Sequence, residues 1–315
     1  MEIGFLQCVT AYLPQNNTIG EGKTELEGCR EVSKGLFVGM VTLDLVYLCA
    51  QLPGHNQKVV ASDYTVAAGG PATNAAVTFS YLGNLATLIG VVGTHPITHL
   101  IRSDLEHYGV TISDLNPTTP DPPPVSSIIV TESTGDRSVI SLNATKIQIT
   151  PDSQSVHLEA GIDIVLIDGH QMSVGCAIAQ FAKNKNIPVV IDGGSWKPGF
   201  EKVLPFVDYA LCSANFYPPG CRNSEEVMAY LVALGIPHIA ITQGEEPIQC
   251  WTLGVSSRIP VPQIKAVDTL AAGDVFHGAF CHSILRQNFA NSLTEAAELA
   301  SYSCQFFGTR QWMKT

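Results

Sequence analysis

The sequence predicts an α/β fold in which helices cover both faces of a mostly parallel sheet. Short apolar runs and segments of helix length alternate along most of the chain, which is the pattern of strand–helix–strand units. The short runs are almost wholly apolar, as expected for parallel strands that are buried on both faces. The expected strands lie at 36–41, 86–92, 164–167, 188–191, 209–212 and 238–242, and the expected helices at 72–82, 97–108, 174–186 and 223–234.

The composition supports a large buried core and excludes some classes of partner. Of the 315 residues, 45% are hydrophobic and only 14% are charged, whereas about 25% are charged in a typical globular protein. The net charge of −11 argues against a nucleic-acid partner, because such proteins need a basic surface. An anionic substrate must therefore be bound by backbone N–H groups and a few local Lys or Arg residues.

Hydropathy and cysteine usage predict a cytoplasmic protein with no membrane partner. The apolar runs are far shorter than the roughly 20 residues of a membrane-spanning helix, and residues 1–35 lack the apolar core of a signal peptide. The nine cysteines are odd in number and include no C-x-x-C pair. We interpret them as free thiols in a reducing cytoplasm. The histidines show no zinc-ligand spacing, so no residue is assigned to a metal.

The first 35 residues and two later segments depart from the strand–helix pattern. Residues 1–35 are polar and irregular, and we expect them to be an N-terminal extension of a domain that covers 36–315. Segment 57–66 alternates weakly, and 125–141 is typical of a hairpin with its turn at 133–136. These strands do not fit a series of strand–helix–strand units. We expect them to form a small accessory sheet.

The strongest functional signal is the segment 268–279, D-T-L-A-A-G-D-V-F-H-G-A, which opens an apolar helix at 275–285. Ala271, Ala272 and Gly273 have minimal side chains, so their N–H groups can approach an anion at the helix N-terminus. Asp274 has two interpretations. It is either the N-cap of this helix, which is common for Asp, or a general base beside an anion hole.

A second signal is the segment 68–76, A-G-G-P-A-T-N-A-A, in which two glycines open an Ala-rich helix. Gly69 and Gly70 allow a ligand to approach the backbone closely, and the amide of Asn74 could bind sugar hydroxyls. The alternative is a plain glycine turn with Asn74 facing solvent. Asp44 either caps a strand end or places a carboxylate at the carboxyl edge of the sheet, where ligands of open α/β folds bind.

Together these segments resemble the two signature regions of the ribokinase-like (PfkB) family of carbohydrate kinases. The family pattern D-T-x-G-A-G-D-x-F-x-G-A matches 268–279 except at Ala271. Within the family the chain is most similar to the ketohexokinase and sulfofructose kinase branch, through 135–137, 213–216 and 274–279. The resemblance implies a three-layer α/β/α fold with a mostly parallel sheet and a small β-lid, formed by about 53–68 and 123–143.

The resemblance also implies ATP-dependent transfer of a phosphoryl group to a monosaccharide hydroxyl. Asp274 matches the family's catalytic base, and Ala271, Ala272 and Gly273 match its anion hole. Asp44, Gly69, Gly70 and Asn74 match positions that hold the sugar. Asn215, Thr242 and Gly244 match the ATP site, with Mg²⁺ carried by phosphate oxygens.

Three departures from the family pattern concern the nucleotide side of the site. Ala271 replaces a glycine, and we expect its methyl group to be tolerated only if φ there is negative. Pro247 replaces the last glycine of T-x-G-x-x-G. The motif N-x-x-E reads Asn215-Phe216-Tyr217-Pro218, so its carboxylate is missing.

Several alternatives stay open at this point. A nucleoside kinase needs aromatic side chains to hold a base, and the expected lid segments contain only Tyr64. The altered nucleotide motifs also allow a non-catalytic sugar-sensing protein. Lys58 and Arg137 either belong to solvated lid surface or grip an anionic group on the substrate. By resemblance, the lid also allows a homodimer.

Overall fold

The computed structural model describes residues 32–142, 148–150 and 160–315. Its larger sheet has nine strands in the order β13-β12-β11-β10-β9-β8-β1-β4-β5. The strands from β11 to β5 are parallel, whereas β12 and β13 form an antiparallel edge. These strands are β1 (Lys34–Val38), β4 (Leu85–Gly90), β5 (Val110–Asp114), β8 (Ile164–Ile167), β9 (Val189–Gly193), β10 (Tyr209–Ser213), β11 (His238–Gln243), β12 (Glu246–Thr252) and β13 (Val255–Ile259).

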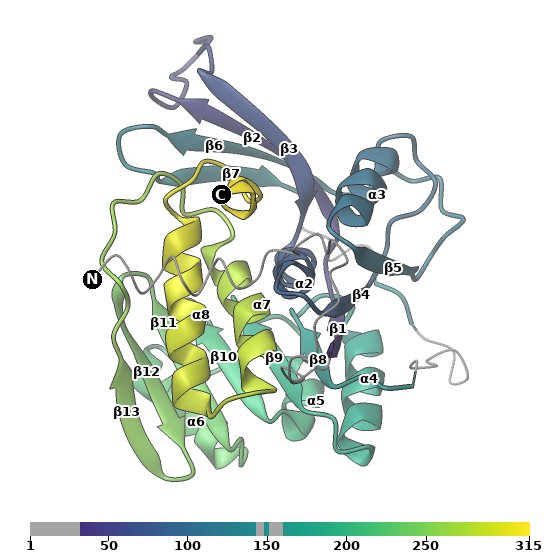
Figure 1. Ribbon diagram of the computed structural model, residues 1–315, viewed down its shortest axis with the longest axis vertical. Coiled ribbons are helices and arrows are strands. Elements are labelled where there is room, and N and C mark those ends of the chain that lie inside the picture. The colour runs from purple at the N-terminus through teal and green to yellow at the C-terminus, as the bar shows by residue number, and fades with distance from the viewer. Residues whose placement is uncertain (1–31, 143–147, 151–159) are drawn as a thin grey trace, which may run out of the picture.

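Helices cover both faces of this sheet and bury a separate apolar cluster on each (Figure 1). In β1, Phe37 belongs to one cluster while Leu36 and Val38 belong to the other, because successive side chains of a strand point to opposite faces. The predicted three-layer α/β/α fold is therefore confirmed. One face carries α2 (Pro71–Tyr81), α3 (Thr98–His107), α7 (Ala272–Ile284) and α8 (Phe289–Ser303), and the other carries α4 (Met172–Asn184), α5 (Phe200–Val203), η2 (Leu204–Phe206) and α6 (Ser224–Ala233).

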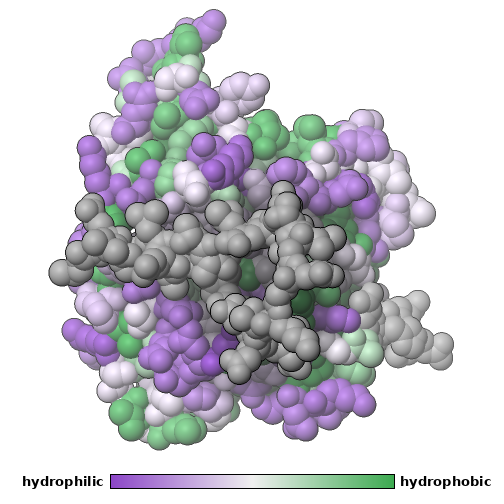
Figure 2. Space-filling view, viewed as in Figure 1, coloured by the Kyte–Doolittle hydropathy of each residue, from purple (hydrophilic) through white to green (hydrophobic). Residues whose placement is uncertain are grey.

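The second sheet has four strands in the order β3-β2-β6-β7 and projects from the body of the molecule (Figures 1 and 2). Figure 2 shows hydrophobic and hydrophilic side chains interspersed on its visible face. The predicted hairpin is present, with a turn between β6 and β7. The strands are β2 (Thr42–Cys49), β3 (Asp63–Gly69), β6 (Val125–Thr131) and β7 (Arg137–Ser141).

Strand β2 of the small sheet was not expected from the sequence. Between β1 and β2 the chain leaves the large sheet at Gly39, where a Cβ atom would lie only 2.1 Å from the Asp168 carboxyl group. Asp44 therefore lies within β2, paired with Ala67 of β3 and Ser126 of β6. From the sequence it was expected either to cap a strand end or to lie at the carboxyl edge of the large sheet, whereas it belongs to a strand of the small sheet.

The remaining boundaries differ from the expected ones by a few residues. The large sheet begins at Lys34, inside the segment expected to be irregular, whereas 1–31 of that segment lie outside the described residues. The first lid segment becomes a strand only at Asp63. Residue 143, where the second lid segment was expected to end, also lies outside the described residues. No helix within the described residues is long and apolar enough to cross a membrane, and the seven described cysteines are free thiols.

Candidate active site

Helix α2 begins directly after β3, at a turn that only glycine can form. Gly70 is its N-cap residue, with φ 104° and ψ 149°, and Pro71 occupies the first helical position. A Cβ atom on Gly70 would lie 2.3 Å from the carbonyl oxygen of Met40. The Oγ1 of Thr73 donates to that same oxygen at 2.8 Å. The start of α2 is thus packed against the β1–β2 connection and buried.

The N-cap residue of helix α7 is Ala271, whose φ is +60°. Negative φ was expected there, and that expectation was wrong: alanine occupies the left-handed region that usually favours glycine, at a cost of about 1–2 kcal/mol. Asp274 is not the N-cap, because it lies inside the first turn of the helix. A Cβ atom built on Gly273 would meet nothing within 4 Å, so the backbone here is open to an approaching anion.

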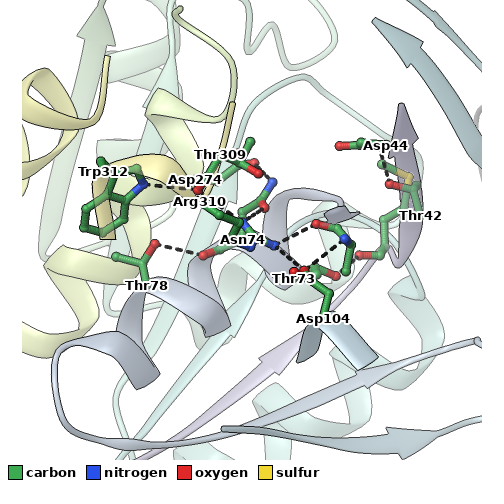
Figure 3. Close-up of polar contacts among 12 residues, drawn as sticks. Thr42, Asp44, Thr73, Asn74, Thr78, Asp104, Asp274, Thr309, Arg310 and Trp312 are labelled. Atoms are coloured by element: carbon green, nitrogen blue, oxygen red, sulfur yellow. Dashed lines mark hydrogen bonds and ion pairs between the residues drawn. The ribbon is translucent and has the colours of Figure 1, made fainter. Parts of the chain in front are cut away.

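The two helix starts meet through one side-chain hydrogen bond. The Nδ2 of Asn74, on α2, donates to Oδ2 of Asp274, on α7, at 2.8 Å (Figure 3). Asn74 is 3% exposed, so its interpretation as a solvent-facing residue is wrong. Its amide still has one N–H and part of its oxygen for a ligand hydroxyl.

Burial raises the pKa of Asp274 to about 7, and the negative charge of Asp192 acts in the same direction. The hydrogen bond from Asn74 and the nearby His277 oppose this rise. A carboxyl group with a pKa near 7 is well matched to accept a proton at neutral pH. Asp192 lies at the end of β9, and its own pKa is raised by burial and lowered in part by His277.

His277 and Asp192 were not identified from the sequence. His277 lies between two carbonyl oxygens, with Nδ1 2.6 Å from Gly273 and Nε2 3.2 Å from Leu211. Its Nδ1 is also 3.5 Å from the Asp192 carboxylate. His277 thereby ties the first turn of α7 to β10. Its place three residues after Asp274 was the only available signal, and many core histidines share such a pattern.

Asp44 faces the same region from the small sheet. Its Oδ1 accepts a hydrogen bond from Thr42 Oγ1 at 2.8 Å, and its pKa is raised by burial. A Cβ atom on Gly69 would lie 1.9 Å from the Asp44 carboxylate, so glycine at 69 leaves room for this side chain. Asp44, Gly69, Gly70, Asn74 and Asp274 are thus brought together from β2, the end of β3, α2 and α7.

Asp168, at the end of β8, connects the elements that carry these residues. Its carboxylate is 1% exposed and accepts from the backbone N–H groups of Met40, Ala72 and His170. Burial favours the neutral acid, but the charge and hydrogen bonds of His170 and the backbone donors lower the pKa of Asp168 on balance. Asp168 was not identified from the sequence.

The expected ATP-site residues lie at the carboxyl ends of β10 and β11. Asn215 is exposed just beyond β10, Thr242 lies near the end of β11, and Gly244 follows with φ 64°. The N–H of Ala214 donates to the carbonyl of Thr242 at 2.9 Å, which holds the two connections together. Pro218, at the position of the family's carboxylate, is buried.

The two expected lid cations occupy different places. Lys58 lies in the exposed connection between β2 and β3. Arg137 opens β7, and its Nη1 donates to both the carbonyl oxygen and Oγ1 of Thr269 at 3.0 Å. Arg137 therefore links the small sheet to the loop that leads into α7.

Comparisons with known proteins agree with this architecture. A family model described as pfkB family carbohydrate kinase matches residues 33–315. The ribokinase of Bacillus subtilis (strain 168) is 24% identical over 283 residues, which cover 88% of this chain and 95% of the relative. The deoxyribokinase of Salmonella typhi is 24% identical over 291 residues, covering 87% of this chain and 93% of the relative. The structure of Arabidopsis thaliana ribokinase complexed with ribose and ATP superposes with a TM-score of 0.73 at 20% identity, covering 90% of this chain and 99% of that one.

Proposed function

The chain belongs to the pfkB family of carbohydrate kinases, and from this premise we propose that it transfers the γ-phosphoryl group of ATP to a hydroxyl group of a monosaccharide. The observation that carries the proposal is the contact between Asn74 and Asp274 at 2.8 Å. It joins a helix start built to hold a sugar to a helix start built to hold an anion. Relatives named ribokinase and deoxyribokinase support a sugar as the acceptor.

In the proposed mechanism Asp274 orients the attacking hydroxyl and accepts its proton. Phosphoryl transfer requires in-line positioning and charge stabilisation more than covalent chemistry. The backbone N–H groups at 271–273 then stabilise the charge that develops on the transferred group, because the N-terminus of α7 is the positive end of its dipole. Asp44 and Asn74 hold other hydroxyls of the sugar.

We assign ATP to the side of the site formed by Asn215, Thr242 and Gly244. Among the described residues, no group of three or more His, Cys, Asp or Glu could hold a metal ion, and Pro218 removes a carboxylate from the family motif. Asn215, Thr242 and Gly244 suit a Mg²⁺ ion that is bound chiefly by the phosphate oxygens of ATP, as is usual for this cation. When bound, Mg²⁺ supplies charge neutralisation on the phosphates.

The small sheet favours a sugar over a nucleoside as the acceptor. Its two tyrosines, Tyr47 of β2 and Tyr64 of β3, are directly paired across the strands. Both therefore lie on the face opposite to Asp44, since side chains three residues apart in a strand point to opposite faces. Neither can stack on a base that is bound beside Asp44.

Arg137 and Lys58 bear on whether the sugar is anionic. The guanidinium of Arg137 is engaged with Thr269, which supports a role in holding the lid against the α7 loop. Lys58 is exposed in the connection between β2 and β3. We therefore propose a neutral monosaccharide as the first substrate class to test.

The outer face of the small sheet supports association with a second copy. Tyr64 and Ile140 are 68% and 75% exposed, and apolar side chains on a projecting sheet are a common interaction surface. We propose a homodimer through this face, testable by light scattering with Ile140→Lys. The free cysteines fit a cytoplasmic location.

A sugar panel tests the proposed function directly. The full chain is incubated with ATP, Mg²⁺ and each of a set of neutral ketoses, pentoses and hexoses, with sugar phosphates as the anionic arm. ADP formation is coupled to a spectrophotometric assay, and ³¹P NMR identifies the phosphorylated product. Turnover of one sugar, abolished in Asp274→Asn, is the expected result. Tight sugar binding without any ADP formation would instead identify a non-catalytic sugar sensor.

A further inference from the structure

Arg310, close to the C-terminus, is buried against the residues that surround the proposed base. Its side chain is 8% exposed. It comes from the segment that follows α8 and precedes η3 (Gln311–Lys314), and its guanidinium reaches α2, β3 and α3 at once (Figure 3). Neither signature segment of the sequence contains it, and the proposed mechanism makes no use of it.

Each hydrogen bond of this guanidinium has a distinct acceptor. Nη1 donates to Oδ1 of Asn74 at 2.9 Å. Nη2 donates to the carbonyl oxygen of Ala68 at 2.7 Å and forms an ion pair with Oδ2 of Asp104 at 3.2 Å. The same Asp104 oxygen accepts from the N–H of Ala68 at 3.0 Å. Ala68 immediately precedes Gly69, so Arg310 also holds the backbone that leads into the glycine turn.

These contacts determine which way the amide of Asn74 points. An arginine has only donors, and an ionised Asp274 has only acceptors. With Arg310 on one side and Asp274 on the other, a single amide orientation satisfies both: oxygen toward Arg310, nitrogen toward Asp274. The opposite orientation would place an NH₂ group against a guanidinium and an oxygen against a carboxylate.

We infer that Arg310 is a positioning residue for the phosphoryl transfer, which orients the Asn74 amide so that it donates to Asp274. The inference rests on the proposed role of Asp274 as the base. The pKa of Asp274 responds to the charges of Asp192 on β9, Asp44 on β2 and His277 on its own helix, and to the hydrogen bond from the Asn74 amide. Arg310 donates to that amide, and its charge also lowers the pKa of Asp44. Arg310→Lys keeps the charge, so the variant tests the action through Asn74.

The geometry requires arginine rather than any cation. A lysine ammonium is a compact point charge and cannot span the acceptors on Asn74, Ala68 and Asp104 as the planar fork does. Arg310→Lys therefore keeps the charge and loses the orientation. Once Asn74 is free to rotate, Asp274 loses a donor that favours its ionised form. The proton affinity of Asp274 then rises.

The test measures the titration of Asp274 in two ways: by NMR in the absence of substrates, and through the dependence of kcat/KM on pH. Asp side chains are labelled with ¹³C at Cγ, and the Asp274 signal is assigned by its absence in Asp274→Asn. We expect Arg310→Lys to move its midpoint upward by about 0.4 to 1 pH unit, the effect of one lost hydrogen bond. With the sugar found by the panel, kcat/KM should fall about 3- to 10-fold below pH 7 and recover by pH 9.

A matched control and a double variant separate positioning from general damage. Arg102 also pairs with an aspartate, Asp114 at 2.7 Å, and donates to a backbone carbonyl, so Arg102→Lys should leave the midpoint in place. Asn74→Ala should raise it as Arg310→Lys does. Combining the two should add less than about 0.2 unit to Asn74→Ala alone, because one interaction has already been removed.

The outcomes distinguish failure of this inference from failure of the proposed function. An unchanged midpoint in Arg310→Lys, or shifts that add fully in the double variant, would overturn the inference even if a sugar is phosphorylated. If no sugar is turned over, the proposed function fails, while the NMR titration still decides the role of Arg310. If Arg310→Lys does not fold, Asp104→Asn replaces it. Removal of that acid alone would lower the midpoint, so a rise supports the inference and a fall overturns it.

Discussion

Helices α2 and α7 both begin at a residue with positive φ and without a side-chain cap, yet one start requires glycine and the other accepts alanine. At Gly70 a Cβ atom would lie 2.3 Å from the Met40 carbonyl oxygen, and φ is 104° with ψ 149°. At Ala271 the methyl group is present at φ 60° and ψ 14°, a left-handed conformation that side chains adopt at a cost.

The difference follows from what each start is packed against. The start of α2 is closed by backbone and by the Asp168 hydrogen bonds, so its shape is set before any ligand binds. The start of α7 keeps open space at Gly273, which an anion can enter. A site for phosphoryl transfer needs both kinds of surface: a rigid one to orient the acceptor and an open one to receive the charge.

The largest effect should come from the only proposed base, which lies on α7. Asp274→Asn keeps the size of the side chain and can still accept from Asn74, but it cannot take a proton. We expect kcat to fall about 100- to 10,000-fold, measured by coupled ADP release. Thr73→Val, at the corresponding start of α2, should cost less than about tenfold. Comparable losses in both variants would remove the distinction between the two starts.

A substitution at Gly70 should have the largest effect on stability. Gly70→Ala adds a methyl group where the backbone conformation is accessible only to glycine and where Met40 leaves no room. We expect a loss of about 2–4 kcal/mol in the free energy of unfolding, measured by urea denaturation. A loss below about 0.5 kcal/mol would show that the β1–β2 connection can move away.

The raised pKa of Asp274 should produce a change in stability that depends on pH and is intermediate in size. Because its folded-state pKa is about 7 and lies above the ordinary value of 3.8, the folded chain binds this proton more tightly than the unfolded chain. Its contribution to stability therefore falls as pH rises from about 4 to about 7 and is lowest above 7. Asp274→Asn should raise the melting temperature more at pH 8 than at pH 5. A rise in melting temperature that is the same at both pH values would contradict the raised pKa of Asp274.

The smallest effect should follow from relaxing Ala271. Ala271→Gly removes the left-handed strain, but it also increases the entropy of the unfolded chain by about 0.4–1 kcal/mol. The two changes largely offset each other, so we expect stability to rise by no more than about 1 kcal/mol. Turnover should stay within about threefold of the parent. A much faster enzyme would mean that the methyl group obstructs the anion hole.

Local pattern by itself determines the layers of this protein and half of its candidate site. Apolar runs of strand length and the helices between them predict the parallel sheet, because strands buried on both faces must be apolar throughout. The segment around Asp274 and the Gly69–Gly70 pair can also be identified from the sequence. Small residues directly before a helix indicate that a ligand or another part of the backbone approaches closely there.

Only the tertiary structure decides how these parts meet. Asp44 belongs to the small sheet because the chain changes sheets at Gly39, where the limiting atom is the carboxylate of Asp168, more than a hundred positions away. Asn74 points at Asp274 because Arg310, 236 residues later, donates to its oxygen. Ala271 adopts a positive φ although its residue type favours a negative one. For Asp44 and Asn74 the deciding contact joins residues far apart in the chain, and such contacts leave no periodic trace in the sequence.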